Sequence, residues 1–161
     1  MDNIIKIFSD GSCKYEYKIG GWGCILSYNG KEKEFSGSCK DTTNQRMELT
    51  ASLEALKKVN RSTIPIYVMS DSAYLVNGCS QKWYIAWRNN GWFKKSDGRQ
   101  VANRDLWEQL AYYCELYNIK WQWCREEQSL HLQHCHTLAY NKMKEAEILM
   151  LSKNSNQTFH W

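Results

Sequence analysis

Residues 4–12 read IIKIFSDGS, a short run of apolar and β-branched residues followed directly by an aspartate and a glycine. This pattern predicts a central strand over Ile4–Phe8, with Asp10 at its end. A second segment repeats the arrangement, because Ile66–Met69 also predicts a strand and Asp71 follows it. Ligands usually bind at the carboxyl ends of strands in an α/β sheet. If the two strands are neighbours, the two carboxylates are adjacent.

The intervening chain predicts the other elements of an α/β fold. Asn29-Gly30 lies between the strand-like runs Gly21–Tyr28 and Lys31–Cys39, which predicts a β-hairpin. Thr43 or Asn44 is a candidate N-cap for an amphipathic helix that ends near Val59. The remaining predicted elements are a helix over Ala73–Arg88 with a break near Gly78, a basic loop over Gly91–Gly98, a helix over Asn103–Tyr113, a strand over Ile119–Trp123 and a helix over Leu132–Leu151. The order β-β-β-α-β-α-β-α predicts a five-stranded mixed β-sheet with helices on both faces and the first strand central.

The length of 161 residues and the hydrophobic share of 43% suit one hydrophobic core. We expect one catalytic domain over residues 1–151 and a polar, mobile tail over residues 152–161. No apolar stretch approaches the roughly 20 residues that span a bilayer, and the start MDNIIKIF lacks the regions of a signal peptide. These features lead us to expect a monomeric, soluble protein of the cytoplasm or the nucleus.

The seven cysteines are scattered and form no CxxC pair, so we expect free thiols in a reducing compartment. His131, His134, Cys135 and His136 form a C-terminal cluster of potential zinc ligands. The spacing of these four residues matches none of the usual zinc patterns.

A net charge of +4 is too small to establish a nucleic-acid partner by itself. The distribution is more informative, because three tryptophans stand among cationic residues. Aromatic rings interleaved with cations suit a strand that offers phosphates and stackable bases. The residues are Trp83, Trp87, Trp92, Lys94 and Lys95.

Glu48 lies on the stripe of its predicted helix that packs against the sheet, so a third acid points toward Asp10 and Asp71. Three converging carboxylates raise one another's pKa and remain ionised together only beside cations. Hard oxygen ligands favour Mg²⁺ or Mn²⁺, and two such ions roughly 4 Å apart can assist an in-line phosphodiester displacement. The alternative is that Asp10 and Asp71 are ordinary strand-end or N-cap acids.

Four segments are diagnostic together: FSDGSCK (8–14), TNQRMELTA (43–51), SDSAYLVNG (70–78) and VANRDLWEQL (101–110). In their order and spacing they resemble the type 1 ribonuclease H family over residues 4–150. The resemblance implies an endonuclease that cuts the RNA strand of an RNA–DNA hybrid with two Mg²⁺ or Mn²⁺ ions and leaves 5′-phosphate and 3′-OH ends.

The resemblance also implies roles for individual residues. Asp10, Glu48 and Asp71 would be metal ligands. The RNA 2′-hydroxyls would be sensed along the minor groove, where amide side chains can both donate and accept. The residues there would be Cys13, Asn44 and Gln45. Thr43 and Asn103 would hold a phosphate of the DNA strand.

The chain departs from the family pattern at several positions. Tyr15–Ile19 replaces a turn with glycine, proline and an asparagine, and Asp41 stands where a basic residue often supports the phosphate. Members of the family usually have a histidine in the loop before the last helix and then an aspartate in that helix. Here Glu126 aligns with the loop histidine as a candidate general base, and His136 takes the fourth ligand position, facing inward. A neutral imidazole can bind a divalent metal but adds no negative charge.

Two other functions are compatible with parts of this sequence. A hybrid-binding module with impaired catalysis would explain His136, although a pure binder has no need of three mutually repelling acids. An integrase or a Holliday-junction resolvase would share the fold. Neither accounts for the basic, tryptophan-rich segment or for TNQRMEL.

Overall fold

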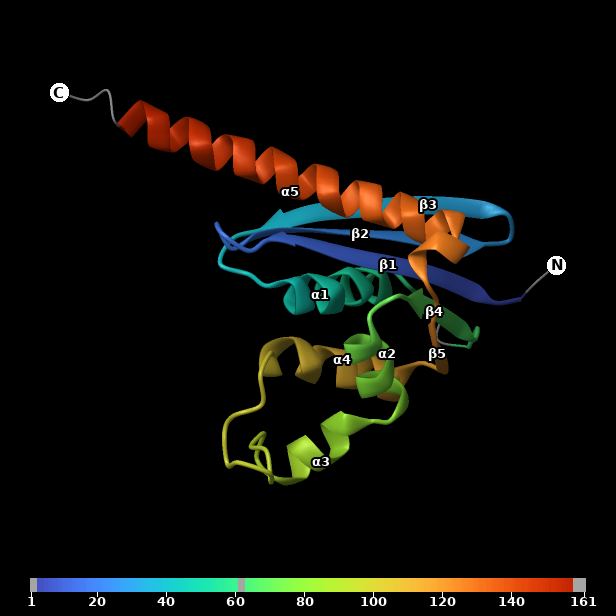
Figure 1. The fold of residues 1–161 in the computed structure, drawn as a ribbon. Helices are drawn as coiled ribbons and strands as arrows, with labels where there is room; N and C mark the ends of the chain where they lie inside the picture. Colours follow the sequence, from blue (N-terminus) through green and yellow to red (C-terminus); the bar gives the residue numbers. More distant parts are fainter. Residues whose placement is uncertain (1–2, 61–62, 158–161) are drawn as a thin grey trace.

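A computed structural model of the chain describes residues 3–60 and 63–157. It contains a five-stranded sheet with the strand order β3-β2-β1-β4-β5 (Figure 1). Strand β2 pairs antiparallel with β1 and with β3, whereas β4 pairs parallel with β1 and with β5. The sheet is therefore mixed, as predicted. The strands are β1 (Ile5–Lys14), β2 (Ile19–Tyr28), β3 (Lys31–Cys39), β4 (Ile66–Ser70) and β5 (Ile119–Trp123).

Helices cover both faces of this sheet. One face carries α1, α2, α3 and α4, and the long helix α5 crosses the other face (Figure 1). The helices are α1 (Asn44–Lys57), α2 (Ala73–Ser80), α3 (Trp83–Asn89), α4 (Arg104–Leu116), the short 3-10 helix η1 (Glu126–Gln128) and α5 (Leu130–Gln157). The predicted fold class is confirmed.

The central strand is longer than expected, and the prediction that Asp10 ends it is wrong. Pairing between β1 and β4 stops at Phe8 and Met69, but pairing between β1 and β2 continues to Lys14. The reason is that the long β2 hairpin partner supports the second half of β1, where β4 is already finished. Asp10 therefore lies within a strand, two positions beyond the last residue that β4 covers.

Local signals account for most element boundaries. The turn between β2 and β3 falls at Asn29-Gly30, where both residues have positive φ, which confirms the hairpin. Thr43 is the N-cap of α1, since its side chain accepts a hydrogen bond from Arg46 N. The last helix extends beyond its predicted end at Leu151, and residues 152–157 of the predicted mobile tail are helical. Residues 158–161 lie outside the described residues.

The predicted break near Gly78 is misplaced, because the chain leaves the helix at Gln81 and Lys82 instead. Gly78 lies inside α2, where a Cβ atom would come within 2.2 Å of Trp107 Cη2. The glycine therefore serves close packing between α2 and α4 rather than a bend.

The main core lies between the sheet and the α1–α4 layer, around Leu53, Leu56, Val68 and Trp107. A smaller cluster lies under α5 and includes Phe8, Ile25, Leu132 and Cys135. Helix α5 approaches β2 very closely, since a Cβ atom on Gly23 would lie 2.7 Å from Cys135 O. Gly23 pairs with Asp10, so this contact brings the start of α5 next to that aspartate.

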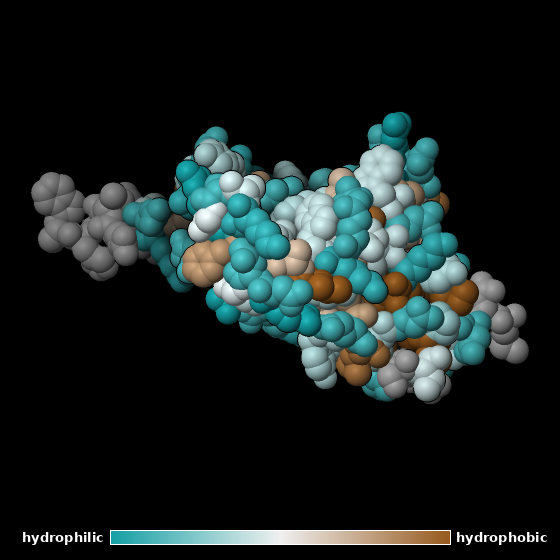
Figure 2. All heavy atoms as spheres, turned by 90° about the horizontal axis from the view of Figure 1, so that it is seen from below, coloured by the Kyte–Doolittle hydropathy of each residue, from teal (hydrophilic) through white to brown (hydrophobic). Residues whose placement is uncertain are grey.

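All seven cysteines, each within the described residues, are free thiols, as predicted. Among those residues, no helix combines the length and apolar character needed to span a membrane. Hydrophilic residues predominate on the face seen from below, with smaller apolar areas between them (Figure 2).

Candidate active site

Three acidic side chains meet where β1, α1 and the end of β4 come together. Asp10 and Glu48 are buried, and Asp71 is half-buried. One oxygen of each carboxylate lies within 4.8 Å of the others. The structure thus brings the three predicted metal ligands to one place.

The environment of these acids opposes their ionisation. Burial, followed by the charge of Asp71, raises the pKa of Asp10 to about 6, although the Gly11 N–H and His136 act in the opposite direction. Burial and the charges of Asp10 and Asp71 raise the pKa of Glu48 well above its usual value. Burial also raises the pKa of Asp71. Such shifts are expected where like charges converge without a cation.

Glu48 carries a further sign of a missing partner. Its Oε2 atom is buried and accepts no hydrogen bond from the described residues. An unsatisfied carboxylate oxygen in the interior is costly unless a ligand completes its environment. A hard divalent cation fits this set of oxygen donors.

A second group of candidate ligands shares Asp10 with the first. Ligand atoms of Asp10, Glu126 and His136 also lie within 4.8 Å of one another. His136 Nδ1 is 3.0 Å from Asp10 Oδ2 and 3.8 Å from Glu126 Oε2. The expectation that His136 faces inward holds only in part, because 45% of its side chain is exposed.

The potential zinc ligands His131, His134, Cys135 and His136 do not converge on one point in the described part of the chain. His131 Nε2 lies 2.8 Å from Glu32 Oε1, and His134 Nε2 lies 2.6 Å from Glu34 Oε2, so both rings are bound to β3. Cys135 is buried between α5 and the sheet, and His136 turns toward Asp10. Consecutive residues of a helix point in different directions, so His134, Cys135 and His136 leave α5 toward β3, the core and Asp10 respectively.

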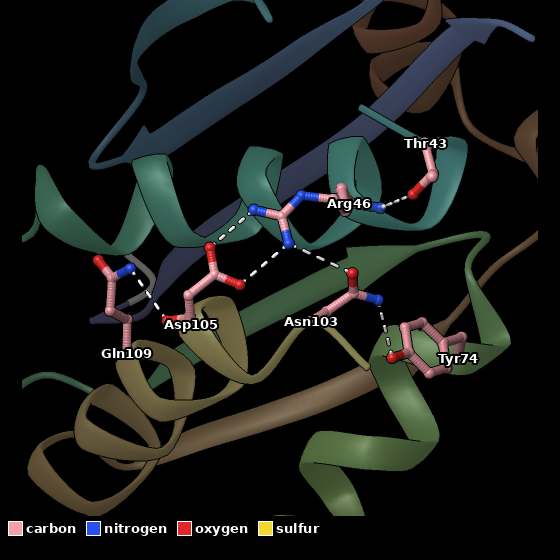
Figure 3. A network of polar contacts seen from close by, with 6 residues as sticks. All are labelled: Thr43, Arg46, Tyr74, Asn103, Asp105 and Gln109. Carbon is pink, nitrogen blue, oxygen red and sulfur yellow. Dashed lines mark hydrogen bonds and ion pairs between the residues drawn. The ribbon is translucent and has the colours of Figure 1, made fainter. Parts of the chain in front are cut away.

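The predicted phosphate contacts belong to one polar network (Figure 3). Thr43 Oγ1 accepts a hydrogen bond of 3.1 Å from the Arg46 backbone, and the Arg46 guanidinium donates to Asn103 Oδ1 at 3.3 Å. Arg46 also donates two hydrogen bonds to Asp105, at 2.9 and 2.7 Å. The hydrogen bonds from Arg46 hold the pKa of Asp105 below its usual value. Arg46 thus bonds to Thr43 through its backbone and to Asn103 through its guanidinium, which links the start of α1 to the start of α4.

The predicted minor-groove residues lie beside this network. Asn44 and Gln45 are exposed in the first turn of α1, and the Cys13 thiol donates to Thr42 O at 3.7 Å. In the turn after β1 that departs from the family pattern, Glu16 is exposed.

The aromatic part of the basic segment packs differently from the prediction. Trp92 is buried, so the expectation that it stacks on a substrate is wrong. Trp83 and Trp87 are half-buried, with ring centroids 6.3 and 5.4 Å from that of Trp107. The indoles pack on one another because they close the core around α4.

The cations of this segment remain accessible. Lys95 is exposed and Lys94 is half-buried, and Phe93 pairs with Gln100 to form a small two-stranded turn around them. These lysines can therefore still reach a nucleic-acid backbone.

The sequence patterns do not predict two hydrogen-bonding contacts near the site. One involves the backbone of Asp71, and the other involves the side chain of Asn103. Trp123 Nε1 donates a hydrogen bond of 2.9 Å to the carbonyl oxygen of Asp71. Tyr74 links Asn103 to Trp107 through its hydroxyl. Neither has a signal in the local sequence, because both contacts join elements that are distant along the chain.

Known proteins resemble this chain in sequence. Residues 2–144 match the family described as RNase H. A protein named Ribonuclease H from Francisella philomiragia is 45% identical over 123 residues, which cover 76% of this chain and 79% of that protein. Its namesake from Francisella tularensis subsp. novicida is 44% identical over the same shares.

Solved structures share the fold at lower identity. LC9-RNase H1, described as a type 1 RNase H with the type 2 active-site motif, has a TM-score of 0.73 at 24% identity and covers 90% of this chain and 74% of its own. An N-terminal RNase H domain from Mycobacterium tuberculosis has a TM-score of 0.72 at 16% identity, with 91% and 98% covered. A foamy viral protease-reverse transcriptase in complex with an RNA/DNA hybrid has a TM-score of 0.69 at 18% identity, with 87% and 20% covered.

Proposed function

This chain belongs to the ribonuclease H family, and from that premise we propose that it hydrolyses the RNA strand of RNA–DNA hybrids with the help of two divalent cations. The observation that carries the proposal is the pair of ligand groups that share Asp10. One group would hold the first cation through Asp10, Glu48 and Asp71. The other would hold the second through Asp10, Glu126 and His136.

The donor set favours Mg²⁺ or Mn²⁺, because carboxylate oxygens dominate and only one imidazole takes part. When bound, such cations would supply charge neutralisation at the scissile phosphate and an activated water. The products would be 5′-phosphate and 3′-OH ends.

Glu126 and His136 are the residues best placed to handle protons. A carboxylate only accepts hydrogen bonds, so without a cation His136 donates from Nδ1 to Asp10. A cation held through Nδ1 by Asp10, Glu126 and His136 would displace that proton. Glu126 is partly exposed beside this ring and is our candidate general base. Its carboxylate can take a proton from water while the imidazole keeps Asp10 oriented.

The substrate would lie along the exposed start of α1. Cys13, Asn44 and Gln45 would contact the RNA–DNA minor groove, where a 2′-OH both donates and accepts hydrogen bonds. Thr43 and Asn103 would hold a phosphate of the DNA strand, and Lys94 with Lys95 would add affinity for the backbone.

The alternative function, a module that binds hybrids but has impaired catalysis, is supported by the contact between His136 and Asp10. His136 takes up one oxygen of Asp10 and brings no negative charge, which weakens the second cation position relative to a carboxylate. A protein with that defect would bind hybrids but cut them slowly.

One assay separates these functions. The purified protein is incubated with an RNA–DNA hybrid labelled on the RNA strand, with Mg²⁺, Mn²⁺ or EDTA, and with duplex DNA and duplex RNA as comparison substrates. The Asp10→Asn protein, purified in parallel, controls for contaminating nuclease. Metal-dependent cutting of the RNA in the hybrid alone supports the proposal, whereas tight hybrid binding without cutting in either metal supports the binding module.

A further inference from the structure

Tyr74 joins the metal-binding side of the site to the predicted phosphate contacts. It lies in the first turn of α2, shortly after Asp71, and is half-buried. Its hydroxyl oxygen is 2.8 Å from Trp107 Nε1 and 3.2 Å from Asn103 Nδ2, and Figure 3 shows it beside the Asn103 amide.

The directions of these hydrogen bonds follow from the chemistry of the partners. A guanidinium only donates, so the atom of Asn103 that faces Arg46 must be the oxygen. The amide nitrogen then faces Tyr74 and donates to it. The indole N–H of Trp107 also only donates. The Tyr74 oxygen therefore accepts two hydrogen bonds, which uses both of its lone pairs.

This arrangement leaves the proton of the Tyr74 hydroxyl without an acceptor in the described part of the chain. The second N–H of the Asn103 amide is likewise not used there. Thr43 Oγ1 accepts from the Arg46 backbone and keeps its own proton available. Three donors of one network thus remain for an external group, and a group that only accepts hydrogen bonds suits them.

We propose that Tyr74 is a positioning residue for the DNA strand, an inference that rests on the proposed function. Its hydroxyl fixes the orientation of the Asn103 amide and donates its own proton to the same backbone phosphate that Asn103 and Thr43 hold. Arg46 is engaged by Asp105 with two hydrogen bonds, so its role is to orient Asn103. A phosphate oxygen accepts from several donors at once, as this network requires.

The test combines Tyr74→Phe with single methylphosphonate substitutions along the DNA strand of the hybrid. Binding is measured by fluorescence anisotropy without metal, so the result does not depend on cleavage. In the wild-type protein, neutralising one particular phosphate should weaken binding more than neutralising its neighbours. Tyr74→Phe should weaken binding to the unmodified hybrid about tenfold, as expected for one lost hydrogen bond to a charged group. The same variant should reduce the effect of that one methylphosphonate.

Tyr117→Phe is the matched control, because the Tyr117 hydroxyl donates to Val59 O at 2.9 Å on a part of the fold that the network does not include. It should leave both binding and the methylphosphonate profile unchanged. Asn103→Ala combined with Tyr74→Phe should weaken binding less than the sum of the single changes, because the two residues act on one phosphate.

Two outcomes overturn the inference. An unchanged affinity of Tyr74→Phe would do so, and so would a methylphosphonate profile identical to that of the wild type, which would make the hydroxyl purely structural. Thermal unfolding of each variant verifies that it is folded. If the wild-type protein bound hybrids but did not cut them, the proposed hydrolysis would fail while this inference would still be decided by the binding data.

Discussion

The Nδ1 atom of His136 lies 3.0 Å from Oδ2 of Asp10, on the carboxylate that both candidate ligand groups share. Asp10 Oδ1 accepts a hydrogen bond of 2.9 Å from Gly11 N. Each oxygen of Asp10 therefore already has one partner within the protein, while Glu48 Oε2 has none among the described residues. Ionised Asp10 is thus held in place, whereas a cation at this site would supply the partner that Glu48 Oε2 lacks.

Asp10→Asn should abolish cleavage of the hybrid and leave hybrid binding nearly intact. The change removes the one carboxylate that belongs to both ligand groups. Cleavage and binding are measured side by side on one labelled hybrid, with Glu108→Gln as a control at an exposed ion pair with Arg104. If Asp10→Asn cleaved the hybrid at the wild-type rate, the proposal that two cations bind around Asp10 would be contradicted.

The same variant should alter the pH dependence of stability in the metal-free protein. The pKa of Asp10 is raised from its ordinary value of 3.8 to about 6 in the folded state. The folded protein therefore binds this proton more tightly than the unfolded chain does. Protonation of Asp10 thus stabilises the folded state fully below pH 3.8, and this stabilisation is lost as the pH rises through about 6. Asparagine does not ionise, so Asp10→Asn should not lose stability at this position as the pH rises.

Urea unfolding in EDTA at several pH values between about 4 and 7 measures the effect. The unfolding midpoint of Asp10→Asn should exceed that of the wild type by an amount that grows with pH. Parallel curves for the two proteins would show that ionisation of Asp10 does not oppose folding.

Sequence patterns predicted most of the fold, because hydrophobic period and turn chemistry are local properties. The bounds Lys31–Cys39 and Ile119–Trp123 agree with the observed strands. The second half of β1 was not predicted, since FSDGSCK lacks an apolar alternation and becomes a strand only through its pairing with β2. Gly78 was misread for a related reason, because its role depends on Trp107, which is distant in the sequence.

The candidate site shows the same limit. Asp10, Glu48 and Asp71 converge because of the order of the strands and the helix face on which Glu48 lies. Both features can be predicted from the sequence pattern. Burial of Trp92 and the bonds of Tyr74 depend on tertiary packing. A tryptophan in a segment with several cationic residues has the same local pattern whether its ring packs inward or outward, so composition alone does not separate the two.

Lys94→Ala combined with Lys95→Ala should weaken hybrid binding and flatten its dependence on salt. Each phosphate contact releases counterions, so the slope of log affinity against log salt should fall by up to about two. Lys31→Ala with Lys33→Ala is the control, because these exposed lysines lie on β3 next to the hairpin turn. An unchanged slope would mean that Lys94 and Lys95 do not contact phosphates.

Gly78→Ala should destabilise the protein by about 1–3 kcal/mol, as overpacking of a core does. Alanine would favour the helix by about 1 kcal/mol, but its Cβ would lie 2.2 Å from Trp107 Cη2. The steric cost should prevail in chemical denaturation. Asn77→Ala, at an exposed position of the same helix, should be neutral or slightly stabilising. Equal stability of Gly78→Ala and wild type would show that α2 and α4 can separate at little cost.

His136 offers the sharpest test of the second cation position, because its replacements change charge and ligand type at one place. His136→Asp would bring a hard, negatively charged ligand beside Glu126, and should lower the Mg²⁺ concentration needed for half-maximal cleavage. His136→Ala should raise that concentration by about tenfold or more, because loss of even a residue that only orients a metal ligand weakens metal binding by about 10–100-fold. Activity should remain measurable in the alanine variant, because Asp10, Glu48 and Asp71 still form the first ligand group.

The comparison is a Mg²⁺ titration of the three proteins on one hybrid, with His134→Ala as a control. His134 lies on the same helix but bonds to Glu34, so its removal should not change the requirement for metal. His136→Asp also places a fourth carboxylate near three acids whose pKa values are already raised, so its metal-free form should unfold more readily than the wild type at neutral pH. Added Mg²⁺ should reverse that difference by binding only the folded state. Indistinguishable titrations would make His136 a bystander, and Asp10 and Glu126 would then hold the second cation without it.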